Sequence, residues 1–329
     1  MYDIYGLGNA LVDTEYQVDD GYLRTHGIDK GHMTLVDETR LRTLLAGLSE
    51  RPAKRISGGS AANSIYAAQG FGTRTYYSCK VAKDDTGNHF LADLKEAGVH
   101  CNENACHSSG TSGECLILVT PDAERSMTTF LGISSALSEA EVDSSALRQS
   151  RFFYVEGYLS SNASSLSAAV AAKALAEAAS VKTAVSLSDT SMVVHCRDGL
   201  EQILGNGVDQ LFCNEEEALS WARTDRLDVA IHELKDIARV CNITLGAAGS
   251  LSVIDGKQTP IAGYQVQAVD TNGAGDIYAG AYLAMICKGK EPTHATRFAN
   301  FAAAQLVTHI GARLPTISGY RQLLAKFNG

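Results

Sequence analysis

The sequence lacks the features that would place the protein in a membrane or on a nucleic acid. Its most apolar long stretch, residues 168–179, is interrupted by Lys173 and Glu177 and is too short to cross a bilayer. The 329-residue chain has 28 basic against 37 acidic residues, a net charge of −9. Such a balance argues against a nucleic-acid or anionic-membrane surface, because both need clustered Lys and Arg. We therefore expect neither partner.

Metal and disulfide motifs are also missing. The eight cysteines include no CxxC pair, and neither they nor the nine histidines show metal-ligand spacing. Several cysteines, such as Cys115 and Cys213, lie inside apolar runs, where buried free thiols are common. Residues 1–4 are not a basic region followed by an apolar core, so no signal peptide is indicated. We expect reduced, structural thiols and a cytoplasmic protein.

Two common nucleotide-binding motifs are absent or incomplete. No GxxxxGK[ST] sequence occurs, so any phosphate must be bound in another way. Gly6 and Gly8 follow a predicted strand, but the sixth position of the dinucleotide fingerprint is Leu11 rather than Gly or Ala. Asn9 and Asp13 follow the same strand, at the end where open α/β sheets bind ligands. A turn held by these two side chains is the alternative interpretation.

The sequence does contain a regular alternation of apolar strands and helices in its second half. Strands are predicted near 152–155, 183–187, 210–213 and 240–245, with helices near 164–180, 195–204, 215–222 and 229–239. This alternation indicates a parallel sheet covered by helices on both faces. Extended pieces between residues 16 and 37, rather than a helix, and a hairpin around residues 121–125 predict a second, small sheet. Arg125 is expected to be exposed at the hairpin tip, with contact to substrate or phosphate as the alternative.

The most informative stretch is DTNGAGD at residues 270–276, which precedes a predicted helix beginning at Asp276. Its small residues let the backbone approach a ligand, and the amides that open a helix lack intrahelical partners and bind anions. A carboxylate at such a site repels phosphate. We therefore interpret Asp276 as a base for a hydroxyl that lies opposite the phosphate. A helix start with an acidic first turn is the alternative.

Three further segments place small or polar residues at a turn or a helix start. Residues 57–64 open a helix with Gly58, Gly59 and Asn63, which suit either a ligand hydroxyl or an ordinary helix start. Asn214 and Glu217 fit a capping box. Residues 244–250 are a glycine-rich turn after a strand, either a nucleotide loop or a tight connection between strands.

These segments resemble, in sequence and in order, the motifs of the ribokinase (PfkB) family of carbohydrate and nucleoside kinases. Residues 270–276 match its DTxGAGD signature, 58–63 its GGxxxN motif, 214–217 its NxxE motif and 244–249 its TLGxxG loop. The resemblance implies a ribokinase-like three-layer α/β/α fold with a mostly parallel central sheet, formed by residues 1–329 as one domain. It also implies a small β-sheet lid built from residues 14–38 and 108–131.

The resemblance assigns roles to individual residues. Asp276 becomes the catalytic base, and its amide forms an anion hole for the transferred phosphoryl group with those of Gly273, Ala274 and Gly275. The substrate-binding residues become Asn9, Asp13, Gly58, Gly59 and Asn63. The ATP-binding residues become Asn214, Thr244, Gly246, Gly249, Thr271 and, near the adenine, Asn300. Two carboxylates become metal ligands: Glu217 for Mg²⁺ through water, and Asp270 for a monovalent cation such as K⁺.

The implied activity is transfer of the γ-phosphoryl group of Mg·ATP to a primary hydroxyl of a nucleoside or sugar. The four-residue spacing of Asn9 and Asp13 and the form of residues 58–64 are closer to the adenosine kinase members. A ketohexose or other sugar kinase is the alternative within the family. A catalytically silent sugar or nucleoside sensor and a nicotinamide-dependent dehydrogenase are the alternatives beyond kinases. The sequence leaves the acceptor open, and the expected assembly is a monomer or a homodimer.

Overall fold

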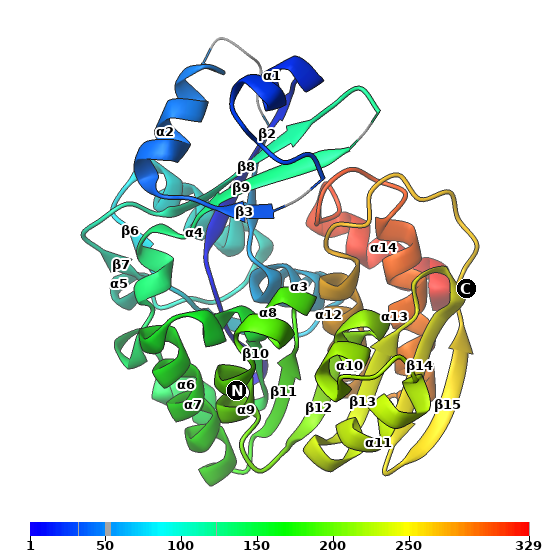
Figure 1. The fold of residues 1–329 in the computed structure, drawn as a ribbon. Helices are drawn as coiled ribbons and strands as arrows, with labels where there is room; N and C mark the ends of the chain where they lie inside the picture. The colour runs from blue at the N-terminus through cyan, green and yellow to red at the C-terminus, as the bar shows by residue number, and fades with distance from the viewer. Residues whose placement is uncertain (32, 50–53, 123, 329) are drawn as a thin grey trace.

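Eight strands form the central sheet of the protein (Figure 1). The computed structural model describes residues 1–31, 33–49, 54–122 and 124–328. In spatial order the strands are β15 (Lys257–Ala262), β14 (Gly249–Ile254), β13 (Ala238–Thr244), β12 (Val208–Asn214), β11 (Lys182–Ser186), β10 (Ser150–Glu156), β1 (Tyr2–Leu7) and β5 (Thr75–Ser78). The strands from β13 to β5 run parallel to one another. At the other end of the sheet β14 pairs in antiparallel fashion with both β13 and β15. The predicted mostly parallel sheet is confirmed.

Helices cover both faces of this sheet and complete a three-layer fold. On one face lie α3 (Ser60–Gly70), α4 (Asp85–Ala97), α12 (Ala274–Cys287), α13 (Pro292–Leu306) and α14 (Ile317–Asn328). On the other lie α6 (Ser144–Arg148), α7 (Ala163–Ala178), α8 (Thr190–His195), α9 (Arg197–Leu204), α10 (Glu215–Ala222) and α11 (Leu227–Ile237). Successive strand residues serve opposite cores, as Phe152 and Phe153 do, because side chains alternate along a strand. This explains the unbroken apolar runs in the sequence.

A second sheet of five strands lies beyond the carboxyl ends of the main strands, at the top of Figure 1. Its order is β3 (Met33–Leu35), β9 (Arg125–Phe130), β8 (Gly113–Val119), β2 (Leu11–Gln17) and β4 (Lys54–Gly58). Two helices, α1 (Asp20–Thr25) and α2 (Glu38–Ala46), bury Leu23, Leu41 and Leu44 against Leu116 and Leu118 of β8. The small sheet therefore has a core of its own. Its strand β4 lies outside the two ranges expected from the sequence.

Smaller elements connect these layers. The strands β6 (Val81–Ala82) and β7 (His107–Ser108) pair with each other, and α5 (Glu103–Cys106) precedes β7. Short 3₁₀ helices occupy Gly132–Ala136, Glu139–Glu141, Gly157–Ser161 and Gly246–Ala248. In the described part of the chain, no helix combines the length and the apolar character needed to traverse a bilayer.

Three expected elements differ from the observed ones. Residues 16–37 were predicted to be extended, yet α1 forms there because Asp19 caps its first turn and accepts a hydrogen bond from the Tyr22 amide. The helix expected at 195–204 is α9, which begins at Arg197 after a separate short helix, α8, that was not expected. The helix expected to begin at Asp276 begins at Ala274, after Gly273. Short or capped helices of this kind leave little periodicity to detect.

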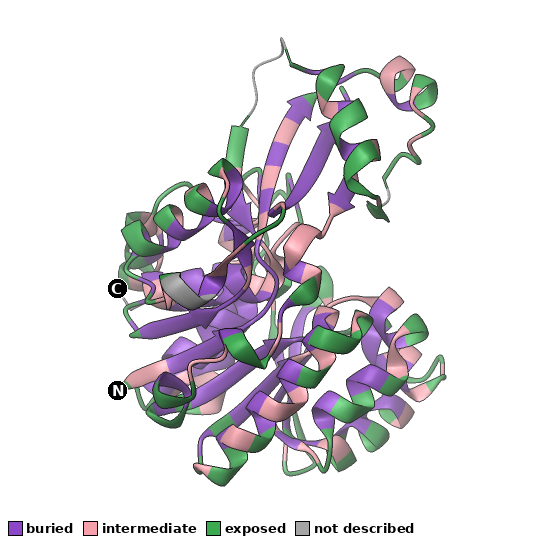
Figure 2. Cartoon of the chain, turned by 90° about the vertical axis from the view of Figure 1, so that its left-hand side faces the viewer, coloured by how far each residue is buried: buried purple, intermediate pink, exposed green. Residues whose placement is uncertain are grey.

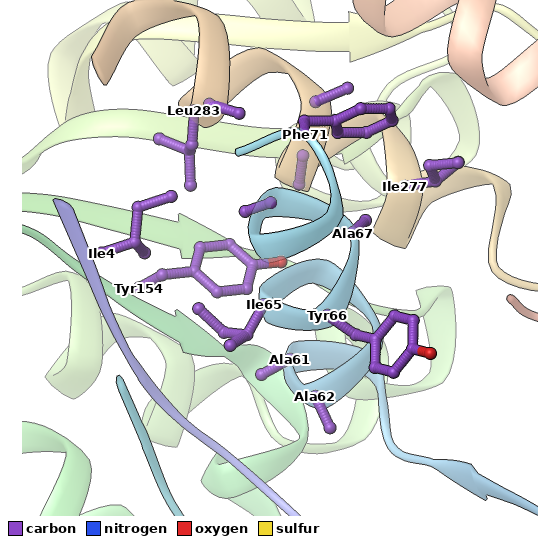
Figure 3. Packing of buried hydrophobic residues seen from close by; sticks show 14 of the residues in the cluster. Ile4, Ala61, Ala62, Ile65, Tyr66, Ala67, Phe71, Tyr154, Ile277 and Leu283 are labelled. Atoms are coloured by element: carbon purple, nitrogen blue, oxygen red, sulfur yellow. The ribbon is translucent and has the colours of Figure 1, made fainter. Parts of the chain in front are cut away.

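The packing of α3 against α12 positions the site described next. In Figure 3, Ala61, Ile65 and Ala67 of α3 lie in the same apolar cluster as Ile277 and Leu283 of α12. A Cβ on Gly280 of α12 would lie 2.3 Å from the Ser64 carbonyl oxygen, so only glycine allows the helices to approach this closely. The burial colours of Figure 2 show the strands and the inner helix faces as the buried parts of the protein. The first turns of the two helices are thereby held side by side.

Candidate active site

A cavity of about 530 Å³ lies between the small sheet and the carboxyl ends of the main strands. This volume is typical of sites for small organic ligands. The main-sheet wall includes the ends of four neighbouring parallel strands, at Glu156, Ser186, Asn214 and Thr244. The small-sheet wall is mostly apolar and consists of Leu11, Asp13, Met33, Leu35, Cys115, Met127 and Thr129. A ligand here would be enclosed between a polar wall and an apolar one.

The cavity brings together most of the residues singled out in the sequence. Those that line it are Asn9, Asp13, Gly59, Asn63, Asn214, Glu217, Thr244, Gly246, Thr271, Gly273, Ala274, Gly275 and Asp276. Segments separated by more than 200 residues meet here, as the 213-residue separation of Asn63 and Asp276 shows. Four predicted residues do not line the cavity: Gly58, Gly249, Asp270 and Asn300.

The four residues outside the cavity make structural contacts next to it. Asn300 donates hydrogen bonds from Nδ2 to the carbonyl oxygens of Ile261 and Ala262, and so holds the end of β15. A Cβ on Gly58 would lie 2.6 Å from the nearest carboxylate oxygen of Asp13, so Gly58 leaves room for that side chain. Gly249 adopts a φ of 106° where β14 begins. Asp270 directly precedes Thr271, which lines the cavity.

Asp276 occupies the first turn of α12 and is fixed by two residues of α3. Its Oδ1 accepts a hydrogen bond of 2.6 Å from Ser60 Oγ, and its Oδ2 accepts one of 2.9 Å from Asn63 Nδ2. Burial raises the pKa of Asp276 to about 6, against the opposing effects of these two hydrogen bonds and of the Arg313 charge. A carboxylate with such a pKa is ionised at neutral pH and can accept a proton readily.

The turn before Asp276 presents free amides to the cavity. Gly273 caps α12 with a φ of 74°, and a Cβ there would lie 2.5 Å from the Ala312 carbonyl oxygen. Within the described residues, the amides of Gly275 and Asp276 have no backbone acceptor, as expected for the first turn of a helix. Nothing lies within 4 Å of the position a Gly275 Cβ would take. The turn therefore has the form of an anion site.

Hydrogen bonds to Glu156, Tyr77 and Ser134 hold Asn9 in place. The fully buried Glu156 carboxylate accepts hydrogen bonds from the amides of Asn9, at 2.8 Å, and Ala61, at 2.6 Å. Asn9 also accepts from Tyr77 and Ser134 through its backbone and side-chain oxygens. Burial raises the pKa of Glu156 to about 7. Glu156 thus joins β10 to the loop after β1 and to the start of α3.

Asp13 differs from Asn9, although the sequence grouped the two at the end of one strand. It lies on β2 of the small sheet, where it pairs with Ile56 and Cys115. Among the described residues its carboxylate has no hydrogen-bond partner. Burial raises its pKa to about 7, opposed by the charges of Arg313 and Arg125. Asp13 is therefore an acceptor available to a ligand in the cavity.

Arg125 is not the exposed hairpin-tip residue expected from the sequence. Its side chain is 13% exposed, because it reaches from β9 of the small sheet towards the main body. Its Nη2 lies 2.8 Å from Glu15 Oε2, and its Nη1 lies 3.2 Å from Asp270 Oδ2. Asp270 also accepts hydrogen bonds from the amides of Asn272 and Gly311. An ion pair thus links the small sheet to the loop that carries the free amides.

The capping box predicted at Asn214 and Glu217 is confirmed. The Asn214 side chain accepts from the Glu217 amide at 2.7 Å, and the Glu217 carboxylate accepts from the Asn214 amide and side chain. Glu217 is only 5% exposed, and burial raises its pKa to about 7, with Asp189 next to it as a further cause. Both carboxylates line the cavity. The described residues contain no group of three or more His, Cys, Asp or Glu side chains arranged to hold a metal ion.

The loop after β13 forms the remaining part of this wall. Gly246 begins a 3₁₀ turn with a φ of 57°, and no atom lies within 4 Å of the position its Cβ would take. The Leu245 amide closes the turn on the Gly249 carbonyl oxygen at 2.8 Å. Thr244 ends β13 beside Asn214, its partner on β12. The loop leaves open backbone next to the anion site, as a nucleotide-binding loop requires.

Comparison with known proteins decides the family. The family model described as pfkB family carbohydrate kinase matches residues 49–318, which is most of the chain. The chain belongs to the pfkB family. A crystal structure of adenosine kinase from Sinorhizobium meliloti is 32% identical, with a TM-score of 0.89, 98% of this chain covered and 99% of that one. A probable sugar kinase from Rhizobium etli CFN 42 is 27% identical, with the same TM-score and 99% of each chain covered.

Curated sequences give the same result. Adenosine kinase 2 of Arabidopsis thaliana is 25% identical over 343 aligned positions that cover 95% of each chain. The expected ribokinase-like fold and PfkB membership are confirmed. As a pfkB family kinase, this protein transfers a phosphoryl group from ATP to a small molecule of the sugar or nucleoside class.

Sequence reasoning missed several residues that shape this pfkB family site. Glu156 follows a predicted strand directly, so the rule that ligand groups follow parallel strands would have found it. Ser60 lies in the helix start predicted at residues 57–64, but nothing in the sequence indicated that its hydroxyl donates to Asp276. Arg313, which contacts Asn63 across 250 residues of sequence, has no local signal at all. The same holds for the apolar side chains Met33 and Leu35, which only the pairing of β3 with β9 brings to the cavity.

Proposed function

We propose that this kinase phosphorylates adenosine or a closely related nucleoside at its primary hydroxyl group. The relatives from Arabidopsis thaliana and Sinorhizobium meliloti are both named adenosine kinases. The apolar small-sheet wall suits the flat faces of a nucleobase, and the unpartnered Asp13 carboxylate suits ribose hydroxyls. The pocket therefore has an apolar part that suits the nucleobase and a hydrogen-bonding part that suits the ribose.

The observation that carries the proposal is the position of Asp276. Its carboxylate faces the same cavity as the free amides of its own helix start, and it is held there by Ser60 and Asn63. An anion site and a base in contact with one cavity suit the transfer of a phosphoryl group to a hydroxyl. A silent sensor needs no such carboxylate, and this favours the kinase.

The proposed mechanism assigns one task to each group. Asp276 accepts the proton of the attacking hydroxyl, a contribution of about 10²–10⁴-fold in rate. The amides of Gly273, Gly275 and Asp276 stabilise the charge on the transferred phosphoryl group, where preorganised donors are most effective, whereas the Ala274 amide already donates to the Thr271 carbonyl oxygen at 3.2 Å. Asp13 and the backbone around Gly59 hold the acceptor. We assign Thr244, Gly246, Thr271 and Asn214, which line the cavity, to the nucleotide.

Mg²⁺ fits the donor set of this cavity. Glu217 and Asp189 supply carboxylate oxygens on the nucleotide side, and too few side chains converge to replace the ion's water shell. Mg²⁺ characteristically keeps several waters beside one or two carboxylates and the substrate phosphates. Glu217 is the ligand we assign, through water. When bound, the ion would neutralise phosphate charge during transfer.

A monovalent cation at Asp270 fits less well. Both carboxylate oxygens already accept amide hydrogen bonds, and Arg125 contributes a positive charge 3.2 Å from Oδ2. A second cation at this carboxylate would have to displace the guanidinium of Arg125. We therefore assign Asp270 to the contact with Arg125, and K⁺ would bind only after Arg125 has withdrawn.

The small sheet, comprising residues 11–17, 33–35, 54–58, 113–119 and 125–130, acts as the lid in this proposal. It covers the cavity from the side opposite the main strands, and the Arg125 contact with Asp270 holds it close. Closure would exclude water and suppress ATP hydrolysis. The strands β3 and β4 are its two edges, so the assembly is either a monomer or a homodimer joined at an edge. The eight cysteines, all within the described residues, are free, which suits the cytoplasm.

A sugar kinase is the second candidate, because the Rhizobium etli structure named as a probable sugar kinase matches with the same TM-score of 0.89. Both candidates use the same base and anion site. They differ in what meets the apolar small-sheet wall, since a free sugar has no nucleobase to place there.

The test is ADP release from Mg·ATP with adenosine, other nucleosides, ribose, fructose and aminosugars, beside Asp276→Asn. We expect turnover with adenosine and a loss of about 10²–10⁴-fold in kcat for the variant. Turnover with a sugar alone would replace adenosine by the second candidate. Unchanged turnover in Asp276→Asn would reject the base assignment.

A further inference from the structure

Arg313 lies directly behind the Asp276 base, in the segment between α13 and α14. It is 4% exposed, and its guanidinium contacts three residues of two helices. Its Nε donates to Asn63 Oδ1 at 2.7 Å, and its Nη1 donates to Asp93 Oδ2 at 2.8 Å. Its central carbon lies 4.4 Å from the centre of the Tyr66 ring, within cation–π range. None of the motifs in the sequence includes this residue.

The contact with Asn63 determines which way the Asn63 amide faces. An asparagine side chain has a donor end and an acceptor end, and the two are interchangeable in shape. Arginine is only a donor and stays protonated, so it accepts only the Oδ1 end as its partner. With Oδ1 bound to Arg313, Asn63 Nδ2 points to Asp276 Oδ2 at 2.9 Å. A reversed amide would place an oxygen against the carboxylate and an NH₂ group against the guanidinium.

Arg313 also acts on Asp276 by its charge. Burial and, in addition, the Asp276 charge raise the pKa of the acidic and phenolic groups that face Asp276, which come from several elements: Asp13 on β2, Tyr154 and Glu156 on β10, Tyr158 after β10 and Glu217 on α10. Burial raises the pKa of Asp276, while the hydrogen bonds from Ser60 and Asn63 and the charge of Arg313 lower it. Arg313 therefore opposes the desolvation that would otherwise keep the Asp276 carboxyl protonated.

We propose that Arg313 is a positioning residue for the Asp276 base, which it serves by fixing the Asn63 amide and by keeping the carboxylate ionised. The inference rests on the proposed function, since Asp276 must be the base. Asn63 then has a different role from the one the sequence suggested. Its amide group connects the arginine to the base, with Oδ1 on one and Nδ2 on the other.

The test uses Arg313→Met, Arg313→Lys, Asn63→Ala and the double variant Asn63→Ala/Arg313→Met in the full chain. The matched control is Arg197→Met, because Arg197 lies 4.4 Å from the Trp221 ring and pairs with Glu201 but is remote from the cavity. Initial rates with Mg·ATP and the accepted nucleoside are measured from pH 5 to 9. The pKa of Asp276 in the free protein is measured separately by carboxyl ¹³C NMR of Asp-labelled protein.

We expect Arg313→Met to lower kcat by roughly tenfold, within the contribution of a positioned base, with the KM for ATP within about twofold of wild type. Its Asp276 pKa and the acid limb of its kcat profile should both move to higher pH. Arg313→Lys keeps the charge and should return the acid limb towards wild type. At pH 8–9, where the Asp276 carboxylate is ionised and the charge effect of Arg313 no longer limits the rate, the double variant should be no slower than Asn63→Ala, because both changes break one connection. Arg197→Met should behave as wild type.

Two results separate failure of this inference from failure of the proposed function. If Asp276→Asn is inactive while Arg313→Met retains wild-type kcat, acid limb and Asp276 pKa, the positioning role is rejected and the base assignment stands. Multiplicative losses in the double variant at pH 8–9 would reject the connection through Asn63. If Asp276→Asn is as active as wild type, the base assignment is rejected, and this inference is rejected as well because it depends on that assignment. Should Arg313→Met not fold, Arg313→Lys and Asn63→Ala are judged by the same readouts.

Discussion

The two walls of the cavity differ in what their side chains do before a ligand arrives. On the main-sheet wall the polar groups already bond to one another, as Asp276 does with Ser60 and Asn63. On the small-sheet wall the side chains are mostly apolar, and Met33 and Leu35 remain 40% and 55% exposed. The polar side chains of the main-sheet wall are thus held in position before a ligand binds, whereas the apolar side chains of the small-sheet wall remain exposed. Preorganisation of this kind suits catalysis, and exposed apolar surface suits binding.

The packing below each wall explains the difference. The main-sheet wall includes the first turns of α3 and α12, and these helices approach so closely that Gly280 contacts the Ser64 carbonyl oxygen. Such packing leaves little freedom to the first turns that carry Ser60 and Asp276. The small sheet has a separate, smaller core under α1 and α2, and Arg125 connects it to the main body through Asp270. We therefore expect changes on the main-sheet wall to lower kcat and changes on the small-sheet wall to raise KM.

Asp13→Asn gives the largest expected effect on the small-sheet wall and tests this division most directly. Asp13 is the carboxylate on that wall without a hydrogen-bond partner among the described residues, so a substrate hydroxyl would be its first donor. Loss of a hydrogen bond to a charged group is worth about 1.5–3 kcal/mol. We expect the KM for the nucleoside to rise roughly 10- to 100-fold, with kcat and the KM for ATP changed little.

This experiment belongs at pH 8, because burial raises the pKa of Asp13 to about 7 and the carboxylate must be ionised. Asp122→Asn is the control, since Asp122 lies on the same small sheet's hairpin but is exposed and pairs with Lys30. A nucleoside KM that stays at the wild-type value in Asp13→Asn would show that the small-sheet wall holds no hydroxyl of the substrate.

Stability against pH gives the next largest effect and compares the walls without a substrate. Four carboxyls that line the cavity have raised pKa values: about 7 for Asp13, Glu156 and Glu217, and about 6 for Asp276. Between about pH 4 and 7 the folded chain holds protons that the unfolded chain has released. Unfolding then becomes more favourable as pH rises, by up to a factor of ten per unit for each group. We expect the Tm of the free protein to fall between pH 5 and pH 8.

Glu156→Gln isolates the contribution of one of these four carboxyls to the pH dependence of the Tm. The amide replaces a carboxyl that must ionise in a fully buried place, so the Tm should depend less on pH than in wild type. Glu139→Gln, at an exposed acid, is the control. A Tm that rises steadily from pH 5 to pH 8 in the wild type would contradict the raised pKa values of all four groups.

The same contrast decides what the sequence could predict. Each motif of the main-sheet wall is local in sequence, such as Asn214 with Glu217 in their capping box, although the motifs meet one another across as many as 213 residues. Local chemistry is enough to find such groups. The small-sheet wall depends on which strands pair. Asp13 was expected to follow the first strand, whereas it lies on β2, because nothing local shows that a second strand begins at Leu11. Arg313 was missed for the same reason, since its partners Asn63 and Asp93 lie on distant helices.

Met33→Ala and Leu35→Ala give the smallest expected effect and examine the apolar wall itself. Both side chains lie on the edge strand β3 and line the cavity while remaining partly exposed, so their removal should hardly change the Tm. Burial is worth roughly 25 cal/mol per Å², so the loss of a few tens of Å² of contact amounts to about 1 kcal/mol. The nucleoside KM should rise about three- to tenfold in each variant. Val194→Ala is the control, since Val194 is 58% exposed on α8 and does not line this cavity. A fall in kcat at constant KM would mean that the apolar wall acts on the chemical step, and the division between a binding wall and a catalytic wall would not hold.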